Sequence, residues 1–227
     1  VLADLGGKPK IQHVWEKAWH AKILDDLIIA CDEEIVAKAA RAFGAKVVLT
    51  SKGHLSGTDR IAEVVNPLDV KVIVNIQGDE PLIQPVMIEK VARALLEDRA
   101  LVMATLMKKI EDPAIINDPH VVKVVVDSNN FALYFSRSAI PYRAINSEIN
   151  QPVYFKHIGL YSYTKDFLFT YKQLPVSVLE KTECLEQLRV LQEGFRIKVI
   201  ETEHDTVGVD TPDDLEKVRA YLESEKK

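Results

Sequence analysis

The sequence predicts an α/β protein with a doubly wound, mostly parallel sheet. Short, continuously apolar segments, typical of strands buried on both faces of a parallel sheet, alternate with segments of helical periodicity in the first half of the chain. Polar residues cluster directly after these apolar segments, at the edge where such sheets bind ligands. We expect a single domain over residues 1–227, because no linker, repeat or low-complexity segment precedes the charged tail.

The first half of the chain supplies the alternating elements. Residues 6–9, Gly-Gly-Lys-Pro, lead into an amphipathic helix. The Gly-Gly-Lys sequence lacks the spacing of a phosphate-binding loop and favours a turn before a helix. The other expected elements are strand 27–30, a helix opened by residues 32–34 and closed by Gly44, strand 47–49, helix 58–65, strand 72–76, helix 85–96 and strand 101–106.

The alternation of strand-like and helix-like segments changes in the second half of the chain. Segments 121–126 and 131–135 alternate β-branched and aromatic residues around a Ser-Asn-Asn turn, which predicts a β-hairpin. We expect residues 119–164 to form an elaboration within the domain. The remaining expected elements are strand 157–163, helices 165–172 and 180–193, strand 195–200 and a last helix over 212–223.

Residues 72–81 carry the most informative functional signal. An apolar strand ends there in Gln-Gly-Asp-Glu-Pro, so Asp79 follows a glycine at the carboxyl end of a strand. An acid in that place is suited to hold a divalent cation bound to a phosphate group. The alternative is structural: Gly78 makes a turn, and Asp79 or Glu80 caps the next helix.

Three further polar segments have a functional and a structural interpretation. Loop 50–60 suits a ligand site or a solvated loop in which Ser56 or Thr58 caps a helix. Arginines 137 and 143, at the end of the hairpin, suit a carboxylate or phosphate but are equally ordinary surface residues. Asp210 precedes Thr-Pro, which favours a helix cap or a second metal carboxylate.

Composition narrows the class of protein. A net charge of -5 argues against a nucleic-acid groove, and neither a membrane span nor a signal peptide is recognisable. Cys31 and Cys184 are expected to be buried free thiols in a reducing compartment, so we expect a cytoplasmic protein. Because such domains usually begin with a strand and a loop, we also expect a first strand and its loop upstream of Val1.

Five motifs occur in one order along nearly the whole chain. They are Ile-Val-Asn-Ile-Gln-Gly-Asp-Glu-Pro at 73–81, Ser-Gly-Thr-Asp-Arg at 56–60, Ala-Leu-Tyr-Phe-Ser-Arg-Ser-Ala-Ile-Pro at 132–141, Leu-Glu-Gln-Leu-Arg at 185–189 and Gly-Val-Asp-Thr-Pro at 208–212. Together they resemble the 3-deoxy-D-manno-octulosonate (Kdo) cytidylyltransferases, the CMP-Kdo synthetases of Gram-negative bacteria.

The resemblance implies a nucleotide-diphospho-sugar transferase-like fold that couples CTP to Kdo, releasing pyrophosphate and making CMP-Kdo for lipopolysaccharide. It implies that Asp79 and Asp210 are catalytic and hold Mg²⁺, and that the upstream loop grips the triphosphate. It further implies a homodimer formed through the hairpin region. Gln77 would bind substrate, and Ser56 and Arg60 would line the cytidine side. The implied Kdo-facing residues are Arg137, Arg143, His157, Tyr161, Glu186 and Gln187.

The chain departs from the family pattern in places, and rival functions stay open. Lys10 stands where the family is usually apolar, Cys31 stands where threonine is common, and Arg143 follows a spacing one residue short. One alternative is a cytidylyltransferase for another acidic sugar, namely sialic acid or 8-amino-Kdo. The others are a non-catalytic nucleotide-binding protein and a sugar transferase that uses a nucleotide-sugar donor.

Overall fold

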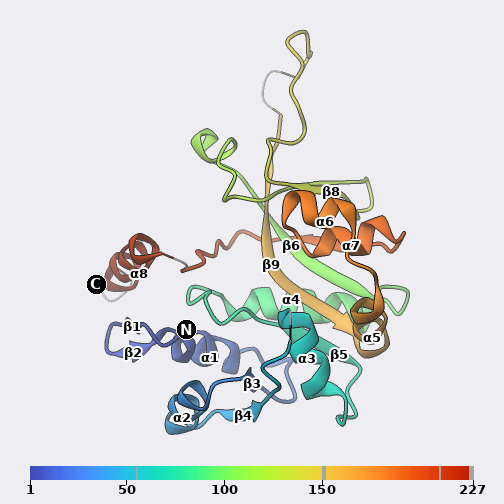
Figure 1. Ribbon diagram of the computed structural model, residues 1–227. Coiled ribbons are helices and arrows are strands. Elements are labelled where there is room, and N and C mark those ends of the chain that lie inside the picture. The colour runs from blue at the N-terminus through green and yellow to red at the C-terminus, as the bar shows by residue number, and fades with distance from the viewer. Residues whose placement is uncertain (55, 150–151, 210, 225–227) are drawn as a thin grey trace.

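A computed structural model describes residues 1–54, 56–149, 152–209 and 211–224, with a six-stranded sheet at its centre (Figure 1). Strand β9 (Phe155–Thr164) runs antiparallel to β5 (Val72–Asn75) on one side and to β6 (Met103–Lys109) on the other. Strand β10 (Lys198–Glu201) pairs in parallel with β6. The sheet is therefore mixed: the expected α/β class is confirmed, but the central strand runs against its neighbours.

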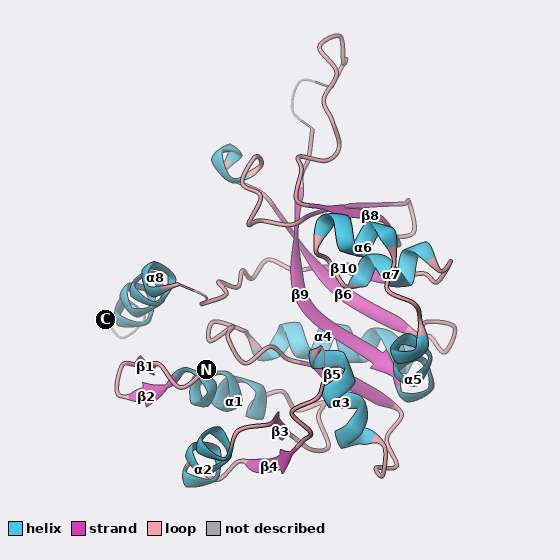
Figure 2. Cartoon of the chain, viewed as in Figure 1, coloured by secondary structure: helices cyan, strands magenta, loops and turns pink. Residues whose placement is uncertain are grey.

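Among the described residues, four further strands lie outside this sheet, in two separate pairs (Figure 2). Strands β3 (Ile28–Cys31) and β4 (Lys46–Leu49) form a separate parallel pair, as the alternating first half predicts. Strands β1 (Asp4–Leu5) and β2 (Lys8–Pro9) form a small hairpin whose two glycines both have positive φ. The Gly-Gly-Lys segment is thus a turn before a helix, as expected.

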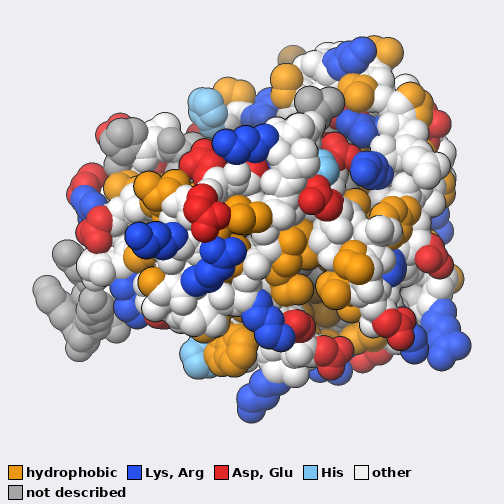
Figure 3. All heavy atoms as spheres, turned by 60° about the horizontal axis from the view of Figure 1, so that its bottom comes forward, with side chains coloured by type: hydrophobic (Ala, Val, Ile, Leu, Met, Phe, Trp, Pro, Cys, Tyr) orange, Lys and Arg blue, Asp and Glu red, His pale blue; other side chains and the backbone are white. Residues whose placement is uncertain are grey.

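Helices cover both faces of the sheet (Figure 1). No helix in the described ranges has the length and hydrophobicity needed to cross a membrane. On the outer surface, acidic and basic side chains are interspersed over the face seen in Figure 3. The helices are α1 (Lys10–Trp19), α2 (Glu34–Ala42), α3 (Gly57–Val65), α4 (Pro85–Glu97), the 3₁₀ turn η1 (Pro113–Ile115), α5 (Lys165–Gln173), α6 (Val178–Glu183), α7 (Gln187–Gln192) and α8 (Pro212–Ser224).

Strand alternation explains the two cores. Successive side chains of a strand point to opposite faces, so Ile73 packs with α3, α5 and α7, whereas its neighbour Val74 packs with α1 and α4. Tyr163 and Leu160 of β9 divide between the faces in the same way. Each fully buried side chain of leucine size stabilises the fold by ~1.5–3 kcal/mol. The doubly wound arrangement thus follows from the apolar segments.

The expected single helix over 180–193 is wrong. It is two helices, α6 and α7, and Cys184 between them has a left-handed backbone with φ of 53°. The side chain of Cys184 is exposed, which also corrects its expected burial, whereas Cys31 is buried as expected. The break brings Glu183 against the hairpin, a contact between distant parts of the chain that helical periodicity cannot reveal.

The predicted hairpin is confirmed as β7 (Lys123–Val126) and β8 (Ala132–Ser136). Along β8, Phe135 is fully buried in the core, whereas Leu133 is 62% exposed, so the expectation of a dimer interface at this hairpin stays a prediction. The chain after β8 instead extends away from the body before it returns as β9 (Figure 1). The exposed apolar side chains of this extension are Tyr142, Ile145, Ile149 and Val153.

Candidate active site

The Asp79 loop joins β5 to α4 and is held from two sides. A Cβ atom at Gly78 would lie 2.9 Å from Cδ1 of Ile11, so α1 packs closely against this glycine and a larger residue would require the Ile11 side chain to move. The backbone N–H of Val209 donates to the carbonyl of Asp79 at 2.9 Å. This bond brings the segment before α8 to the Asp79 loop, although Asp210 itself lies outside the described residues.

A cavity of about 700 Å³ opens beside this loop. No described residue makes a hydrogen bond or ion pair with the Asp79 side chain, which lines the cavity. The Gln77 amide is tied to Asn75 Oδ1 at 3.3 Å and lines the same cavity. Lys10, which the sequence identifies only as a departure from the family, is buried against this cavity. A lysine on the buried stripe of α1 is the signal that could have identified it.

The carboxylate donors suit Mg²⁺. Among the described residues no three His, Cys, Asp or Glu side chains converge on a metal site. Mg²⁺ does not need such a cage, because it is commonly held by one or two carboxylates together with substrate phosphates and water. The unpaired Asp79 carboxylate, facing an open cavity, fits that requirement.

Glu80 is an unexpected part of the site. One carboxylate oxygen of Glu80 is buried without a hydrogen-bond partner. Burial, reinforced by the negative charge of Asp79, raises the pKa of Glu80 to about 7. The two neighbouring acids therefore differ in environment: the Glu80 carboxyl is inside, and the Asp79 carboxyl faces the cavity.

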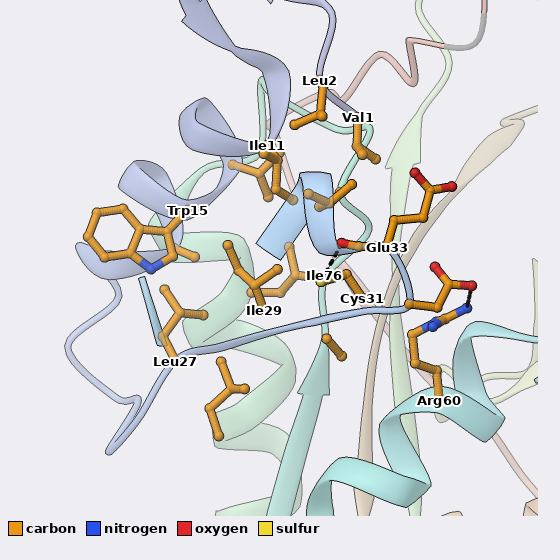
Figure 4. A pocket seen from close by; sticks show the side chains of 17 residues that line it. Val1, Leu2, Ile11, Trp15, Leu27, Ile29, Cys31, Glu33, Arg60 and Ile76 are labelled. Atoms are coloured by element: carbon orange, nitrogen blue, oxygen red, sulfur yellow. Dashed lines mark hydrogen bonds and ion pairs between the residues drawn. The ribbon is translucent and has the colours of Figure 1, made fainter. Parts of the chain in front are cut away.

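A second cavity, an apolar groove of about 520 Å³, lies between β3 and the end of β5 (Figure 4). Gly78 lines both cavities, so they are adjacent. Arg60 stands at the polar end of the groove, where its guanidinium donates to Asp32 at 2.9 Å and to Thr50 Oγ1 at 2.6 Å. This ion pair fixes Arg60 on the side of the groove opposite the apolar α1 contacts (Figure 4).

Ser56 caps α3, as the structural interpretation of its loop predicts, by accepting a 3.2 Å bond from Asp59 N. The Glu186 carboxyl also takes side-chain hydrogen bonds from Thr58 and Ser56. Burial nevertheless raises the pKa of Glu186. Two candidate residues separated by 130 positions, Ser56 and Glu186, are thus in contact.

A β-bulge in β9 orients two further candidate residues, His157 and Tyr161. The pairing of β6 with β9 shifts after Thr105, where two residues of β9 are left over. The Thr105 hydroxyl lies 3.0 and 2.9 Å from the carbonyls of Ile158 and Leu160, between which its single proton is shared, and 3.0 Å from Nε2 of His157. Bulges of this kind re-aim side chains beside active sites.

His157 and Tyr161 contact each other at the bulge, with ring centroids 5.5 Å apart. Burial lowers the pKa of His157 to about 3, so its imidazole is neutral at physiological pH. Burial likewise raises the pKa of Tyr161 far above its ordinary value, which keeps the phenol protonated. Both side chains therefore act as neutral hydrogen-bonding groups.

Gln187 begins α7, directly after Glu186. Its side chain is 5% exposed, and its amide Nε2 is buried with no hydrogen-bond partner. A buried amide donor without a partner is uncommon in folded proteins. Gln187 is therefore suited to receive an oxygen-rich ligand beside Glu186.

The two candidate arginines are placed differently from the others. Arg137 donates from Nε to the Glu183 carbonyl at 2.8 Å and from Nη1 to the Pro119 carbonyl at 3.0 Å. Its guanidinium is thus largely engaged by backbone. Arg143 is exposed on the extension, donating to the Ile149 carbonyl at 3.2 Å. The structure groups neither guanidinium with the cavity of Asp79.

The chain is similar to proteins of known family. Residues 1–200 match the cytidylyltransferase family. A 3-deoxy-manno-octulosonate cytidylyltransferase of Solibacter usitatus is 52% identical over 96% of this chain and 86% of its own length. A solved CMP:2-keto-3-deoxy-manno-octonic acid synthetase complexed with CTP superimposes with a TM-score of 0.92, at 43% identity, over 99% of this chain and 91% of the other.

A more distant structure shares the fold alone. The 4-diphosphocytidyl-2C-methyl-D-erythritol synthase of Anaerococcus prevotii aligns with a TM-score of 0.63 at 16% identity, over 97% of this chain and 91% of that protein. The family match and the Solibacter relative lead to one conclusion: the chain belongs to the cytidylyltransferase family, as one of its 3-deoxy-manno-octulosonate cytidylyltransferases.

Proposed function

We propose that this chain transfers the cytidylyl group of CTP to Kdo, giving CMP-Kdo and pyrophosphate for lipopolysaccharide synthesis. The observation that carries the proposal is the unpaired Asp79 carboxylate, which faces a cavity beside Gln77 in a chain of this family. The named relatives favour Kdo over sialic acid or 8-amino-Kdo. They also favour catalysis over nucleotide binding alone.

The reaction requires in-line displacement at the α-phosphorus. A bond forms from the sugar hydroxyl oxygen to phosphorus, the bond to the pyrophosphate oxygen breaks, and the hydroxyl proton passes to solvent water. Asp79 and Asp210 would hold Mg²⁺, which would neutralise phosphate charge and lower the pKa of the hydroxyl when bound. Gln77 would hydrogen-bond the substrate. Ser56 and Arg60 would line the cytidine side.

The sugar would lie against the other group of candidates. Tyr161, Glu186 and Gln187 offer a phenol, a carboxyl and an unpaired amide, which suit a polyhydroxylated ligand. The neutral imidazole of His157 contacts the Tyr161 ring and would help to hold it in place. We propose that Arg137 and Arg143 bind the sugar carboxylate. To do so, Arg137 must give up one of its hydrogen bonds to a backbone carbonyl.

We also propose an additional strand between β3 and β5, supplied with a phosphate-binding loop from upstream of Val1. Among the described strands, β3 is hydrogen-bonded only to β4 and β5 only to β9, so each has an open edge. The groove between these edges is lined by all four residues of β3. Apolar side chains of Ile11, Ile29 and Ile76 gather around it (Figure 4). An extended apolar segment suits such a slot.

One assay tests both proposals. Magnesium-dependent pyrophosphate release is measured for the full-length protein with CTP plus Kdo, CTP plus sialic acid, and CTP alone. We expect a signal with Kdo only, and none from residues 1–227 without the upstream segment. Equal release with sialic acid would contradict the substrate assignment. Full activity of residues 1–227 would contradict the upstream loop.

We propose a homodimer that forms through the extension after β8, in a cytoplasmic enzyme that draws on the CTP pool of the cell. The support is the exposure of large apolar side chains on a projecting segment: Ile145 is 93% exposed and Tyr142 is 82% exposed. Exposed apolar patches of this kind mark interaction sites.

Replacing Ile145 by glutamate should convert the dimer to a monomer, because a charge would be buried in the interface. Sedimentation velocity of the full-length variant measures this, and Val178→Glu is the matched control, since Val178 is 71% exposed on α6. A variant that sediments like the unmodified dimer would refute an interface at Ile145.

A further inference from the structure

Two lysine side chains are buried among the described residues, and their ammonium groups are paired differently. Lys123 is 0% exposed and donates to three backbone carbonyls, which uses all the protons of an ammonium group. Lys10 is 5% exposed, and the Val209 carbonyl is its hydrogen-bond acceptor within the described part of the chain. Lys10 therefore retains donor capacity that Lys123 does not have.

The surroundings of Lys10 are those of a charged ligand. Among the described residues that line the 700 Å³ cavity, Lys10 and Asp79 have the charged side chains. Gln77 and Thr211 add polar groups to the wall. One hydrogen bond to a carbonyl does not offset the free-energy cost of removing an ammonium group from water. An anion in the cavity would supply the missing acceptors.

The position of Lys10 is fixed by its contacts. Lys10 opens α1, where its backbone N–H donates to the Ala3 carbonyl at 2.9 Å. Val209, the acceptor of its ammonium group, donates in turn to the Asp79 carbonyl. The ammonium group is thereby held near the loop that presents the Asp79 carboxylate. This arrangement places a cation and a candidate metal carboxylate around one cavity.

We propose that Lys10 binds the polyphosphate of the nucleotide: its ammonium group donates to a phosphate oxygen while the Val209 carbonyl keeps the side chain in place. The nature of the ligand rests on the proposed function, whereas the anion site rests on the cavity itself.

Calorimetric binding of inorganic pyrophosphate, with magnesium constant and sugar absent, tests the inference on the full-length protein. We expect Lys10→Gln, which keeps a donor for Val209, to weaken pyrophosphate binding about tenfold. Lys10→Arg should stay within about threefold, because it keeps the charge. The matched control is Lys8→Met, which removes an exposed lysine paired with Glu16 outside the cavity.

The outcomes separate the possible roles of Lys10. If Lys10→Gln binds pyrophosphate like the wild type, the role of Lys10 is limited to its hydrogen bond with the Val209 carbonyl, and the inference is wrong. Should the variants fail to fold, the ε-carbon signal of Lys10 in wild-type protein must still shift when pyrophosphate is added. No shift would overturn the inference. Lys10-dependent binding without CTP–Kdo turnover would leave the inference standing and refute the proposed function.

Discussion

Replacing Asp79 by asparagine is expected to lower magnesium-dependent pyrophosphate release by about a thousandfold, or about 4 kcal/mol in the activation barrier. An amide keeps the size of the side chain but cannot supply the negative charge that a divalent cation needs. Because no described residue bonds to the Asp79 side chain, the free energy of unfolding should change by less than about 0.5 kcal/mol. Steady-state kinetics and thermal unfolding measure the two effects separately.

Asp213→Asn is the matched control for Asp79→Asn. Asp213 is an exposed acid in the first turn of α8 and does not line the cavity. We expect this variant to keep wild-type kinetics. If Asp79→Asn retained a tenth or more of the activity, or if both variants lost activity equally, Asp79 would not be the metal carboxylate.

Replacing Lys123 by methionine should lower the free energy of unfolding by about 2–3 kcal/mol, since three part-buried carbonyls lose their donor. These carbonyls belong to Asp118, Val121 and Arg137, at 2.9, 2.6 and 2.6 Å from Nζ. Relief from burying the ammonium group, which lowers the Lys123 pKa, offsets part of the loss. For a chain of this size the midpoint of thermal unfolding should fall by about 5–10 °C.

Lys198→Met provides the comparison for Lys123. Lys198 is half-buried, and it also donates to a carbonyl, that of Asn129 at 2.6 Å, but this bond is exposed and solvent can replace it. We expect a loss below about 1 kcal/mol. Equal losses in the two variants, measured by urea unfolding, would show that the three hydrogen bonds of Lys123 do not stabilise the hairpin end.

Local patterns predict much of the first half of the chain, because they depend on residues a few positions apart. The apolar segment 72–75 and the polar residues after it predict strand β5 and the position of Asp79 just beyond its carboxyl end. Ser56 is predicted as a cap by its hydroxyl before a helical segment, and it caps α3. Here sequence spacing and structure agree because the contacts are short in range.

Contacts between distant segments account for what the pattern misses. An apolar strand has the same sequence pattern whether its partner is parallel or antiparallel. The sequence therefore does not predict the direction of β9 between β5 and β6. The break at Cys184 depends on Glu183, whose carboxylate accepts from the Ser136 hydroxyl at 2.6 Å and from Arg137 N at 2.9 Å. No helical periodicity contains that information.

The sequence by itself determined the α/β class, the strand before Asp79, the hairpin and, through five motifs, the family of the chain. Tertiary structure alone decided that Glu186 meets Ser56, that Arg137 is engaged by backbone carbonyls, and that Lys10 lies at the cavity of Asp79. The physical reason is the distance along the chain over which each kind of contact acts. Periodicity and capping are set by neighbours along the chain, whereas the partner of a buried charge is set by whichever distant segment packs against it.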